Sequence, residues 1–575
     1  MKNKKLILSI ILIAVVIIIG IIILNNRLNY KIEKIEEIKY NILEQNKKYG
    51  VIDNQGNVLI ESIYDNIQIP NPSKPVFICM KDYDIASKQY NIKVYNDRKE
   101  EILGQYNDVQ ALPTEITSDG IPYEKSVLRY KENDKYGLIS LEGKKIIDPI
   151  YDSITAMNLR EGILLVKKDD KFGLINIKGK VVINPAYDQI TVDSYYISDS
   201  DEKDLGFIVK ETKDESYKYG YFTSKGKKLL DTEYSEIRRI NEIKDDKHVY
   251  LFVSKNGQEG IVKDKKTVLK CEYEDISYNA YNNMFIIQKN SKRGIANIKG
   301  KVIISPQYDN ILFGGMYINA VKDGNIKVLT LNGQEAKDQS IYSKTLTDDK
   351  KYYIAIDKNE VYKVMNSKDE VIIDNNFTYI EYIRDGYFIV AKDGKNGIIN
   401  SEGKSIADLE YNSIFKLNKT DIIQANLNLT NTATFYDKGM NNICEMQDPK
   451  IINKDNYIQI ENNTERRYFD FSGRELQYKE IEPNNKLYAS KVNDKWGFVD
   501  TQGNVVVKNE YEMVTEFNKQ GFAGIKKDGL WGVIDLNGEI IQKPIYDIKW
   551  SNPNFIGKYY EAGMLNTLKY YSDKI

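Results

Sequence analysis

The chain has 575 residues, and its 82 Lys and Arg residues against 83 Asp and Glu residues leave a formal net charge of −1 at pH 7. This balance offers a polyanion no net attraction, so a nucleic-acid partner is not expected. With 42% hydrophobic residues the chain can fold around a large core. One His (His248) and three Cys (Cys79, Cys271, Cys444) remove most side chains that build metal sites and nucleophilic triads. We therefore predict no metal, no cofactor and no catalytic residue.

The first predicted element is an uncharged apolar stretch, LILSIILIAVVIIIGIIIL, at residues 6–24. Its length is close to the roughly 20 residues that cross a bilayer as a helix. A cleavable signal peptide, the alternative, has a shorter apolar part of about 7–15 residues and a small-residue exit, whereas this stretch ends in Ile-Ile-Ile-Leu-Asn-Asn. Lys2, Lys4 and Lys5 before it favour a cytoplasmic N-terminus, although Arg27, Lys31 and Lys34 follow on the other side.

These features predict a single-pass protein of the cell membrane. Residues 1–5 form a cytoplasmic leader, residues 6–24 an uncleaved transmembrane signal anchor and residues 25–39 a polar stalk. The rest of the chain is then extracytoplasmic.

After the predicted stalk, one sequence motif recurs along the chain. An aromatic-Gly pair is followed by apolar residues, a polar turn with Gly, an apolar triplet and Tyr-Asp/Glu-x-Ile. We align the copies on the Gly of the aromatic-Gly pair and call this the ruler position. Fourteen copies then follow one another at a mean spacing of about 37 residues, which is typical of repeat folds. The ruler positions are Gly50, Lys93, Gly137, Gly173, Gly220, Gly260, Gly294, Lys327, Lys363, Gly397, Ala433, Arg467, Gly497 and Gly532.

The sequence pattern of each copy predicts three or four short antiparallel strands, which leave no room for a helix. The aromatic ring is expected to fill the layer between neighbouring units, and the Gly lets another backbone or ring approach closely. The best examples of this structural motif are Tyr49, Gly50, Tyr136, Gly137, Phe172, Gly173, Tyr219, Gly220, Trp496, Gly497, Trp531 and Gly532. The Asp of the Tyr-Asp pair is interpreted as a turn cap that accepts backbone N–H groups. It recurs at Asp65, Asp152, Asp188, Asp309 and Asp547.

The whole motif resembles the bacterial WG-repeat (KWG) family over roughly residues 40 to 550. The likeness is most specific at Lys495–Met513 and Leu530–Asp547, where Trp is present, and poor at Ile326–Tyr342 and Ala433–Lys479. The resemblance implies an all-β repeat array of exported or surface proteins that mediates interactions. It supplies no catalytic residues.

The expected architecture is a propeller-like closure of the repeats into one or two rings, because closure protects strand edges. The alternative is an open stack of β-meanders. We divide the repeats into a first half at 40–325 and a second half at 326–575, the latter with C-terminal strands at Phe555–Tyr560 and Leu565–Tyr571 that complete a first unit or cap an open end.

The predicted binding face is made of the loops whose length varies between copies, because insertions at one structural position project from one face. The segments are Gln68–Pro75, Ala111–Glu124, Thr191–Leu205, Arg238–Lys247 and Ser277–Asn283. Candidate contact residues in them are Tyr195, Tyr196, Asp199, Asp201, Tyr278 and Tyr281. The acidic run at 198–202 has oxygen ligands for Ca²⁺ but lacks the Gly and spaced Glu of an EF-hand, so a solvated loop is the preferred interpretation.

Three functions follow, in this order. The first is a non-catalytic, membrane-anchored surface scaffold that binds a protein or peptide partner. The second is a binder of cell-wall carbohydrate through Tyr-rich loops. The third, remote, is a glycosidase-like enzyme with two carboxylates.

Overall fold

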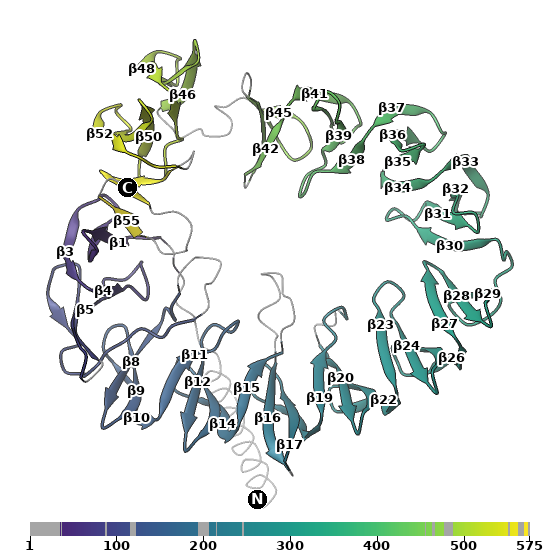
Figure 1. The fold of residues 1–575 in the computed structure, drawn as a ribbon, viewed down its shortest axis with the longest axis horizontal. Coiled ribbons are helices and arrows are strands. Elements are labelled where there is room, and N and C mark those ends of the chain that lie inside the picture. The colour runs from purple at the N-terminus through teal and green to yellow at the C-terminus, as the bar shows by residue number, and fades with distance from the viewer. Residues whose placement is uncertain are drawn as a thin grey trace, which may run out of the picture. The chain divides into compact units, whose positions relative to one another are not determined.

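The computed structural model describes residues 35, 37–86, 89–114, 122–193, 206–213, 215–243, 247–454, 456–462, 466–476, 487–549, 553–561 and 569–572. Every regular element in these ranges is a β-strand, and the strands form fourteen small sheets (Figure 1). The all-β, propeller-like prediction is confirmed. The predicted anchor at 6–24 lies outside the described residues. Within those residues no helix has the length and hydropathy needed to cross a membrane.

The chain forms two compact units, unit 1 from Met1–Arg239 with Asn485–Ile575 and unit 2 from Ile240–Asn484. The first part of unit 1 contains β1 (Tyr40–Gln45), β2 (Lys48–Asp53), β3 (Val58–Tyr64), β4 (Asn66–Gln68), β5 (Phe77–Asp84), β6 (Gln89–Tyr95), β7 (Glu101–Ile102), β8 (Val127–Glu132), β9 (Lys135–Ser140), β10 (Lys145–Tyr151), β11 (Ser153–Ala156), β12 (Ile163–Lys168), β13 (Lys171–Asn176), β14 (Val181–Tyr187), β15 (Gln189–Val192), β16 (Phe207–Lys213), β17 (Ser216–Phe222), β18 (Lys228–Tyr234) and β19 (Glu236–Arg239). Its second part contains β46 (Leu487–Val492), β47 (Lys495–Asp500), β48 (Val505–Tyr511), β49 (Met513–Val514), β50 (Phe522–Lys527), β51 (Leu530–Asp535), β52 (Ile540–Tyr546), β53 (Phe555–Ile556), β54 (Tyr559–Glu561) and β55 (Lys569–Tyr571).

Unit 2 continues the same pattern. Its strands are β20 (Tyr250–Lys255), β21 (Gln258–Lys263), β22 (Lys266–Tyr273), β23 (Asp275–Asn279), β24 (Met284–Lys289), β25 (Lys292–Asn297), β26 (Val302–Tyr308), β27 (Asn310–Gly314), β28 (Tyr317–Lys322), β29 (Asn325–Thr330), β30 (Ile341–Leu346), β31 (Tyr352–Asp357), β32 (Tyr362–Asn366), β33 (Val371–Phe377), β34 (Tyr379–Arg384), β35 (Tyr387–Lys392), β36 (Lys395–Asn400), β37 (Ser405–Tyr411), β38 (Ser413–Lys416), β39 (Ile423–Leu427), β40 (Thr432–Tyr436), β41 (Asn442–Gln447), β42 (Lys450–Asn453), β43 (Ile458–Glu461), β44 (Arg466–Phe469) and β45 (Glu475–Leu476).

Most sheets are four-stranded antiparallel meanders, as in the order β11-β12-β13-β14. Each sheet contains the ruler residue of one copy, in the third strand of the four-stranded sheets and in the middle strand, β9 or β47, of two three-stranded sheets. The fourteen predicted copies therefore correspond to the fourteen sheets of the described residues. The five copies without Gly at the ruler position occupy the same strand as the others. For example, Gly173 in β13 lies opposite Val166, and Arg467 in β44 lies opposite Ile460.

One detail of the predicted unit is wrong. The sequence pattern predicts the segment Tyr-Asp-x-Ile at the end of one copy, but the structure divides it between two sheets. Tyr187 ends β14, Asp188 lies between the sheets, and Gln189 begins β15, the first strand of the next sheet. Each copy therefore supplies a strand to its successor, because the chain crosses to the next sheet at the Asp.

The first sheet has no preceding copy to supply this strand, and the C-terminal strands complete it. Its order is β3-β2-β1-β55-β54-β53, and β55 runs parallel to β1 with Leu43 opposite Tyr570. Tyr560 and Tyr570 are buried in this sheet. The prediction that the C-terminal segment completes a first unit is confirmed, because strands from both ends of the chain share this sheet of unit 1.

The glycine of the aromatic-Gly pair allows a bulge in the neighbouring fourth strand. Opposite Gly173, β14 contains a bulge, because the register shifts between the pairs Phe172–Tyr187 and Leu174–Ile183. A Cβ on Gly173 would lie 2.6 Å from the backbone N of Pro185 and 2.7 Å from the backbone O of Ile183. Any side chain at this position would therefore displace the bulged backbone. Proline and bulges of this kind also keep a sheet edge from pairing with other chains.

Four of the five copies without this glycine also lack the bulge. Lys93 and Arg467 face fourth strands of two residues, β7 and β45, which pair without a register shift. Ala433 lies directly opposite Met446, and the sheet that contains Lys327 has three strands. In three of these copies the ruler side chain forms an ion pair with a Glu eight residues later. The pairs are Lys93–Glu101, Lys327–Glu335 and Arg467–Glu475. Among the described copies, the one at Lys363 is the only one with a long side chain at the ruler position and a bulge in the neighbouring fourth strand.

A second recurring glycine, in the turn between the third and fourth strands, provides a matched test of packing between sheets. Gly300 and Gly403 have φ values of 82° and 79°, so both substitutions to Ala place a side chain in the left-handed region, at a cost of about 1 kcal/mol. A Cβ on Gly300 would also overlap the backbone O of Val268 in the preceding sheet, whereas a Cβ on Gly403 would meet nothing within 4 Å.

We expect Gly300→Ala to lower the free energy of unfolding by about 1–3 kcal/mol more than Gly403→Ala does, because only the first overpacks two sheets. Thermal and urea unfolding of the two variants measure this difference. Equal losses for both would show that the turns, and not their contact with the preceding sheet, need the glycine.

Candidate binding surface

The recurring Asp connects each sheet to the next. Lys171 of β13 donates to Asp188 at 2.5 Å, and the backbone N–H of Thr212, in the next sheet, donates to the other carboxylate oxygen at 2.7 Å. Asp65 pairs with Lys48, Asp152 with Lys135 and Asp309 with Lys292, and each also accepts a backbone N–H from the following sheet. Four of the five predicted turn caps thus make the expected bond. Asp547 pairs with Lys549 instead.

These contacts keep the recurring carboxylates charged. Hydrogen bonds from Lys171 and from Thr212 lower the pKa of Asp188 to about 2. The bond from the paired Lys likewise lowers the pKa of Asp65, Asp152 and Asp309. A carboxyl with a lowered pKa makes a poor proton donor at neutral pH, so this repeated position suits a structural clamp.

The aromatic residues of the motif pack within the sheets. Phe172 lies opposite Tyr187 and Trp496 opposite Tyr511, on the two sides of the bulge. The same register holds for Tyr49, Tyr136, Tyr219 and Trp531. A Lys from the neighbouring strand lies over several of these rings, for example Lys167 over Phe172 at 5.9 Å. Trp531 is fully buried and the other five are half-buried, so these rings belong to the packing of the array.

The two predicted contact residues that the structure describes lie at one end of their sheet. We define the loop end of a sheet as the end where its first strand turns into the second and its third into the fourth. Both lie at this end, Tyr278 near the end of β23 and Tyr281 in the loop between β23 and β24. Tyr195, Tyr196, Asp199 and Asp201, with the acidic run at 198–202, lie outside the described residues.

The two tyrosines that the structure describes differ in exposure. Tyr281 is 61% exposed. Tyr278 is half-buried, donates to the Asn283 side-chain oxygen at 2.7 Å and lies 5.4 Å from the Phe285 ring, and burial raises its pKa. Tyr281 is therefore available to a partner, whereas Tyr278 supports the loop.

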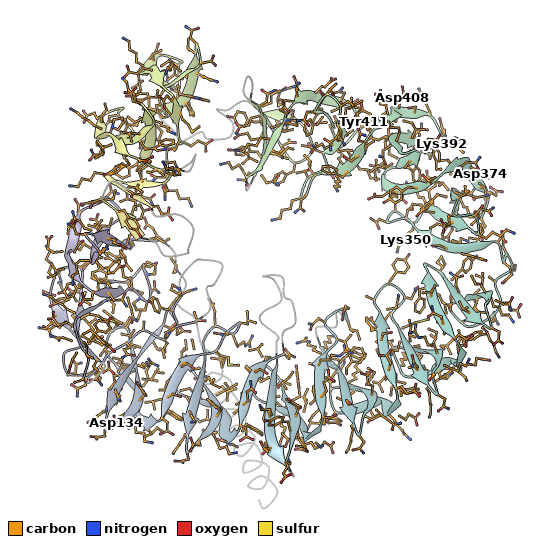
Figure 2. All side chains as sticks on the ribbon, in the orientation of Figure 1. Asp134, Lys350, Asp374, Lys392, Asp408 and Tyr411 are labelled. Atoms are coloured by element: carbon orange, nitrogen blue, oxygen red, sulfur yellow. The ribbon has the colours of Figure 1, made fainter. Side chains whose placement is uncertain are left out.

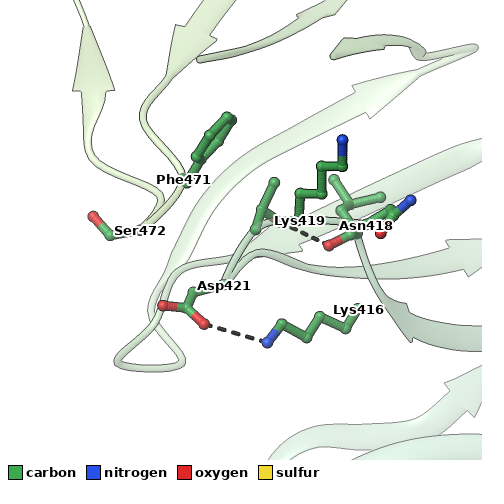
Figure 3. A pocket seen from close by; sticks show the side chains of 8 residues that line it. Lys416, Asn418, Lys419, Asp421, Phe471 and Ser472 are labelled. Carbon is green, nitrogen blue, oxygen red and sulfur yellow. Dashed lines mark hydrogen bonds and ion pairs between the residues drawn. The ribbon is translucent and has the colours of Figure 1, made fainter. Parts of the chain in front are cut away.

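Two large cavities lie at the loop end, each between consecutive sheets. The one in unit 1 has about 700 Å³ and is bounded by the β4–β5 loop at Lys74–Val76, the β6–β7 turn and Leu141. The one in unit 2, the L groove, has about 690 Å³. It is lined by residues 416–421 of the β38–β39 loop and by Phe471 and Ser472 of the β44–β45 turn (Figure 3).

The L groove is built by backbone and charge contacts. The Asp421 N–H donates to the backbone O of Phe471 at 2.6 Å, which fixes the loop of one sheet against the turn of the next. Arg384 donates to the Asp421 carboxylate at 2.6 Å, and Lys416 lies 3.4 Å from the same oxygen. Among the residues that the structure describes, Asp421 is the one acidic residue that lines this groove.

A third, smaller cavity lies at the opposite end of the same sheet. It has about 220 Å³, and its lining includes four amides, Gln424, Asn426, Asn428 and Asn431. In the part of the chain that the structure describes, no three His, Cys, Asp or Glu side chains are grouped in a way that could hold a metal ion.

Sequence reasoning identified part of this surface. The segment Gln68–Pro75 contains two residues of the unit 1 cavity, Lys74 and Pro75. The L groove was missed, because its loop is short and stood out neither by length nor by aromatic content. The signal that was present is the polar sequence KLNKTD, at residues 416–421, at the position where other copies have insertions.

The repeat pattern matches a known family. The model described as "WG containing repeat" matches residues 49–71, 136–172, 172–195, 263–292, 294–315, 364–395, 496–531 and 531–548. The chain belongs to the WG-repeat family. The matched copies contain the aromatic-Gly pairs of β2, β9, β13, β47 and β51, and the unmatched stretches include the copies at Lys93, Ala433 and Arg467, which lack the bulge. A search of curated proteins finds no match.

The solved structures that are similar to this WG-repeat chain match it at low scores. The extracellular domain of BT3049 from B. thetaiotaomicron is 10% identical, with a TM-score of 0.18, 85% of this chain covered and 80% of that one. Hsv2 from Kluyveromyces lactis is 12% identical, with a TM-score of 0.21, 45% of this chain covered and 96% of that one. The WD40 β-propeller domain of Doa1 is 14% identical, with a TM-score of 0.16, 38% of this chain covered and 86% of that one. At such scores these likenesses bear on neither site nor function.

The carboxylate clamp predicts a dependence of stability on pH. Because the pKa of Asp188 is lowered in the folded chain, its contribution is present above its usual pKa near 4 and is lost as the pH falls toward about 2. We expect Asp188→Asn to lower the free energy of unfolding by about 1 kcal/mol at pH 7 and by progressively less between pH 4 and pH 2.

Asp170→Asn is the matched control. The Asp170 side chain is 94% exposed and pairs with Lys167 on the same hairpin, and it makes no bond to another sheet within the described part of the chain. Urea unfolding at pH 7, 4 and 2.5 compares the variants with the parent chain. A loss for Asp188→Asn that persists unchanged at the lowest pH would contradict the role of its charge.

Proposed function

We propose that this WG-repeat chain is a non-catalytic scaffold that binds a protein or peptide partner at the loop end of its sheets. The observation that carries the proposal is the pair of open cavities of about 690 and 700 Å³, both at this end and both between consecutive sheets. Their linings mix apolar and charged side chains, as recognition surfaces for polypeptides do. The motif residues are used in packing and in the clamp, so the loops are the part of each copy that is free to vary.

A second candidate function is carbohydrate binding, and a specific observation favours it. Tyr83 and Tyr90, on the β5–β6 hairpin of unit 1, are 48% and 37% exposed, and their ring centroids are 4.8 Å apart. Exposed rings of this kind present apolar faces to a ligand. Their planes are inclined by 54°, which gives no flat platform for a sugar ring, so the polypeptide partner is preferred.

Site-specific photocrosslinking tests the proposed function. A crosslinking residue placed at Lys350, in the β30–β31 loop at the loop end, is expected to capture a polypeptide in cells that contain the full chain. The same residue at Asp393, in the β35–β36 hairpin at the opposite end, is the control and should capture none; Figure 2 labels Lys350 and, next to this hairpin, Lys392. Equal capture at both positions, or isolation of a glycan and no polypeptide, would contradict the proposal.

The proposal also includes the location of the scaffold. The apolar stretch at residues 6–24 anchors the chain, and the repeats lie outside the cytoplasmic membrane. Protease added to intact protoplasts should then digest the repeats, while a cytoplasmic marker protein stays whole. Survival of the full chain, with digestion after the protoplasts are lysed, would place the repeats inside.

A further inference from the structure

The L groove of unit 2 has a net positive charge. Lys416 and Lys419 line it, and Arg384 and Lys416 contact Asp421, so the groove combines three cationic side chains with one carboxylate. Arg384 donates one bond to the Asp421 carboxylate and one to its backbone O, which positions that carboxylate at the wall of the groove. Among the described residues, Lys419 is exposed and forms no ion pair. The groove therefore has positive charge that the chain itself leaves uncompensated.

The remaining groups of the groove fit a peptide. Phe471 supplies an apolar wall, and Asn418 supplies an amide with both donor and acceptor atoms (Figure 3). Arg384 and Lys416 contact the same Asp421 oxygen, Oδ1, so Oδ2 can accept a backbone N–H. The volume of about 690 Å³ is within the range of sites that enclose a ligand of a few residues.

From these contacts we infer that the L groove binds an acidic peptide segment of the partner, with Lys416 and Lys419 pairing with its carboxylates and Phe471 packing against its apolar atoms. This inference rests on the proposed function and names the chemistry of the partner. A polyphosphate fits less well, because it has no apolar atoms that could pack against the Phe471 ring. Each Lys is also a point charge, without the bidentate geometry that Arg gives to phosphate.

Fluorescence anisotropy of the full chain tests the inference with a labelled peptide, Glu-Leu-Glu-Glu-Leu-Glu, and with the same peptide in which Gln replaces Glu. We expect the Glu peptide to bind and the Gln peptide to bind at least tenfold more weakly. The double variant Lys416→Gln with Lys419→Gln should weaken binding of the Glu peptide about tenfold. Raising the salt concentration should reduce the difference between the two chains, because screening weakens exposed charge pairs.

The matched control removes the same charge elsewhere in unit 2. Lys358 and Lys450 are exposed and lie at the end of their sheets opposite to the loop end. Lys358→Gln with Lys450→Gln should change the affinity less than twofold. Thermal unfolding of both double variants is expected to match that of the parent chain, because all four side chains are exposed.

Three results would overturn the inference. These are equal binding of the Glu and Gln peptides, equal weakening by the control variant, and displacement of the Glu peptide by short-chain polyphosphate at a lower concentration than by unlabelled Glu peptide. If crosslinking at Lys350 still captures a polypeptide, the proposed function stands and only the acidic chemistry of this groove fails. If neither peptide binding nor crosslinking is seen, both fail.

Discussion

The fold depends on the burial of apolar side chains between consecutive sheets. Most hydrophobic clusters of the described residues combine side chains from two neighbouring sheets. One of them joins Leu138 of β9 to Leu164 and Val166 of β12, and another joins Ile389 of β35 to Ile423 of β39. A single sheet of four short strands has too little surface to bury these residues by itself, so its stability comes from its neighbours. The first sheet meets the same constraint by pairing β1 with β55 from the other end of the chain.

The contacts between sheets use a small set of residues. The recurring Asp lies where the chain leaves one sheet, bonds a Lys of that sheet and accepts an N–H from the next. The motif glycine lets the bulged fourth strand pass directly over the third, and its aromatic neighbour pairs across that bulge. The copies at Lys93 and Arg467 still lie in four-stranded sheets, and the copy at Lys327 lies in a three-stranded one. In all three an ion pair is present in place of the bulge. The array therefore tolerates two local solutions to the same packing problem.

This use of the motif explains why a binding surface must lie elsewhere. The motif side chains are engaged in contacts that recur along the array, so none of them defines a single site. Variation is concentrated at the loop end, where Lys74 in one unit and Lys416 in the other line cavities between sheets. The chemistry of these cavities is that of contact surfaces, with charged and apolar groups side by side. A repeat fold of this kind presents many such surfaces, and each can change without loss of the core.

The sequence by itself determined the strand content, the number of copies and the position of the ruler residue in each sheet, because these depend on local periodicity and on turns that Gly permits. It also located the turn-capping Asp and the C-terminal strands that complete the first unit. Only the tertiary structure decided that each copy is divided between two sheets, since strand pairing and not motif spacing sets that boundary. Only the tertiary structure brought Arg384, Asp421 and Phe471 to one groove, because they come from three successive sheets and share no motif. Contacts between copies depend on how the sheets pack, and no short-range pattern in the chain records that packing.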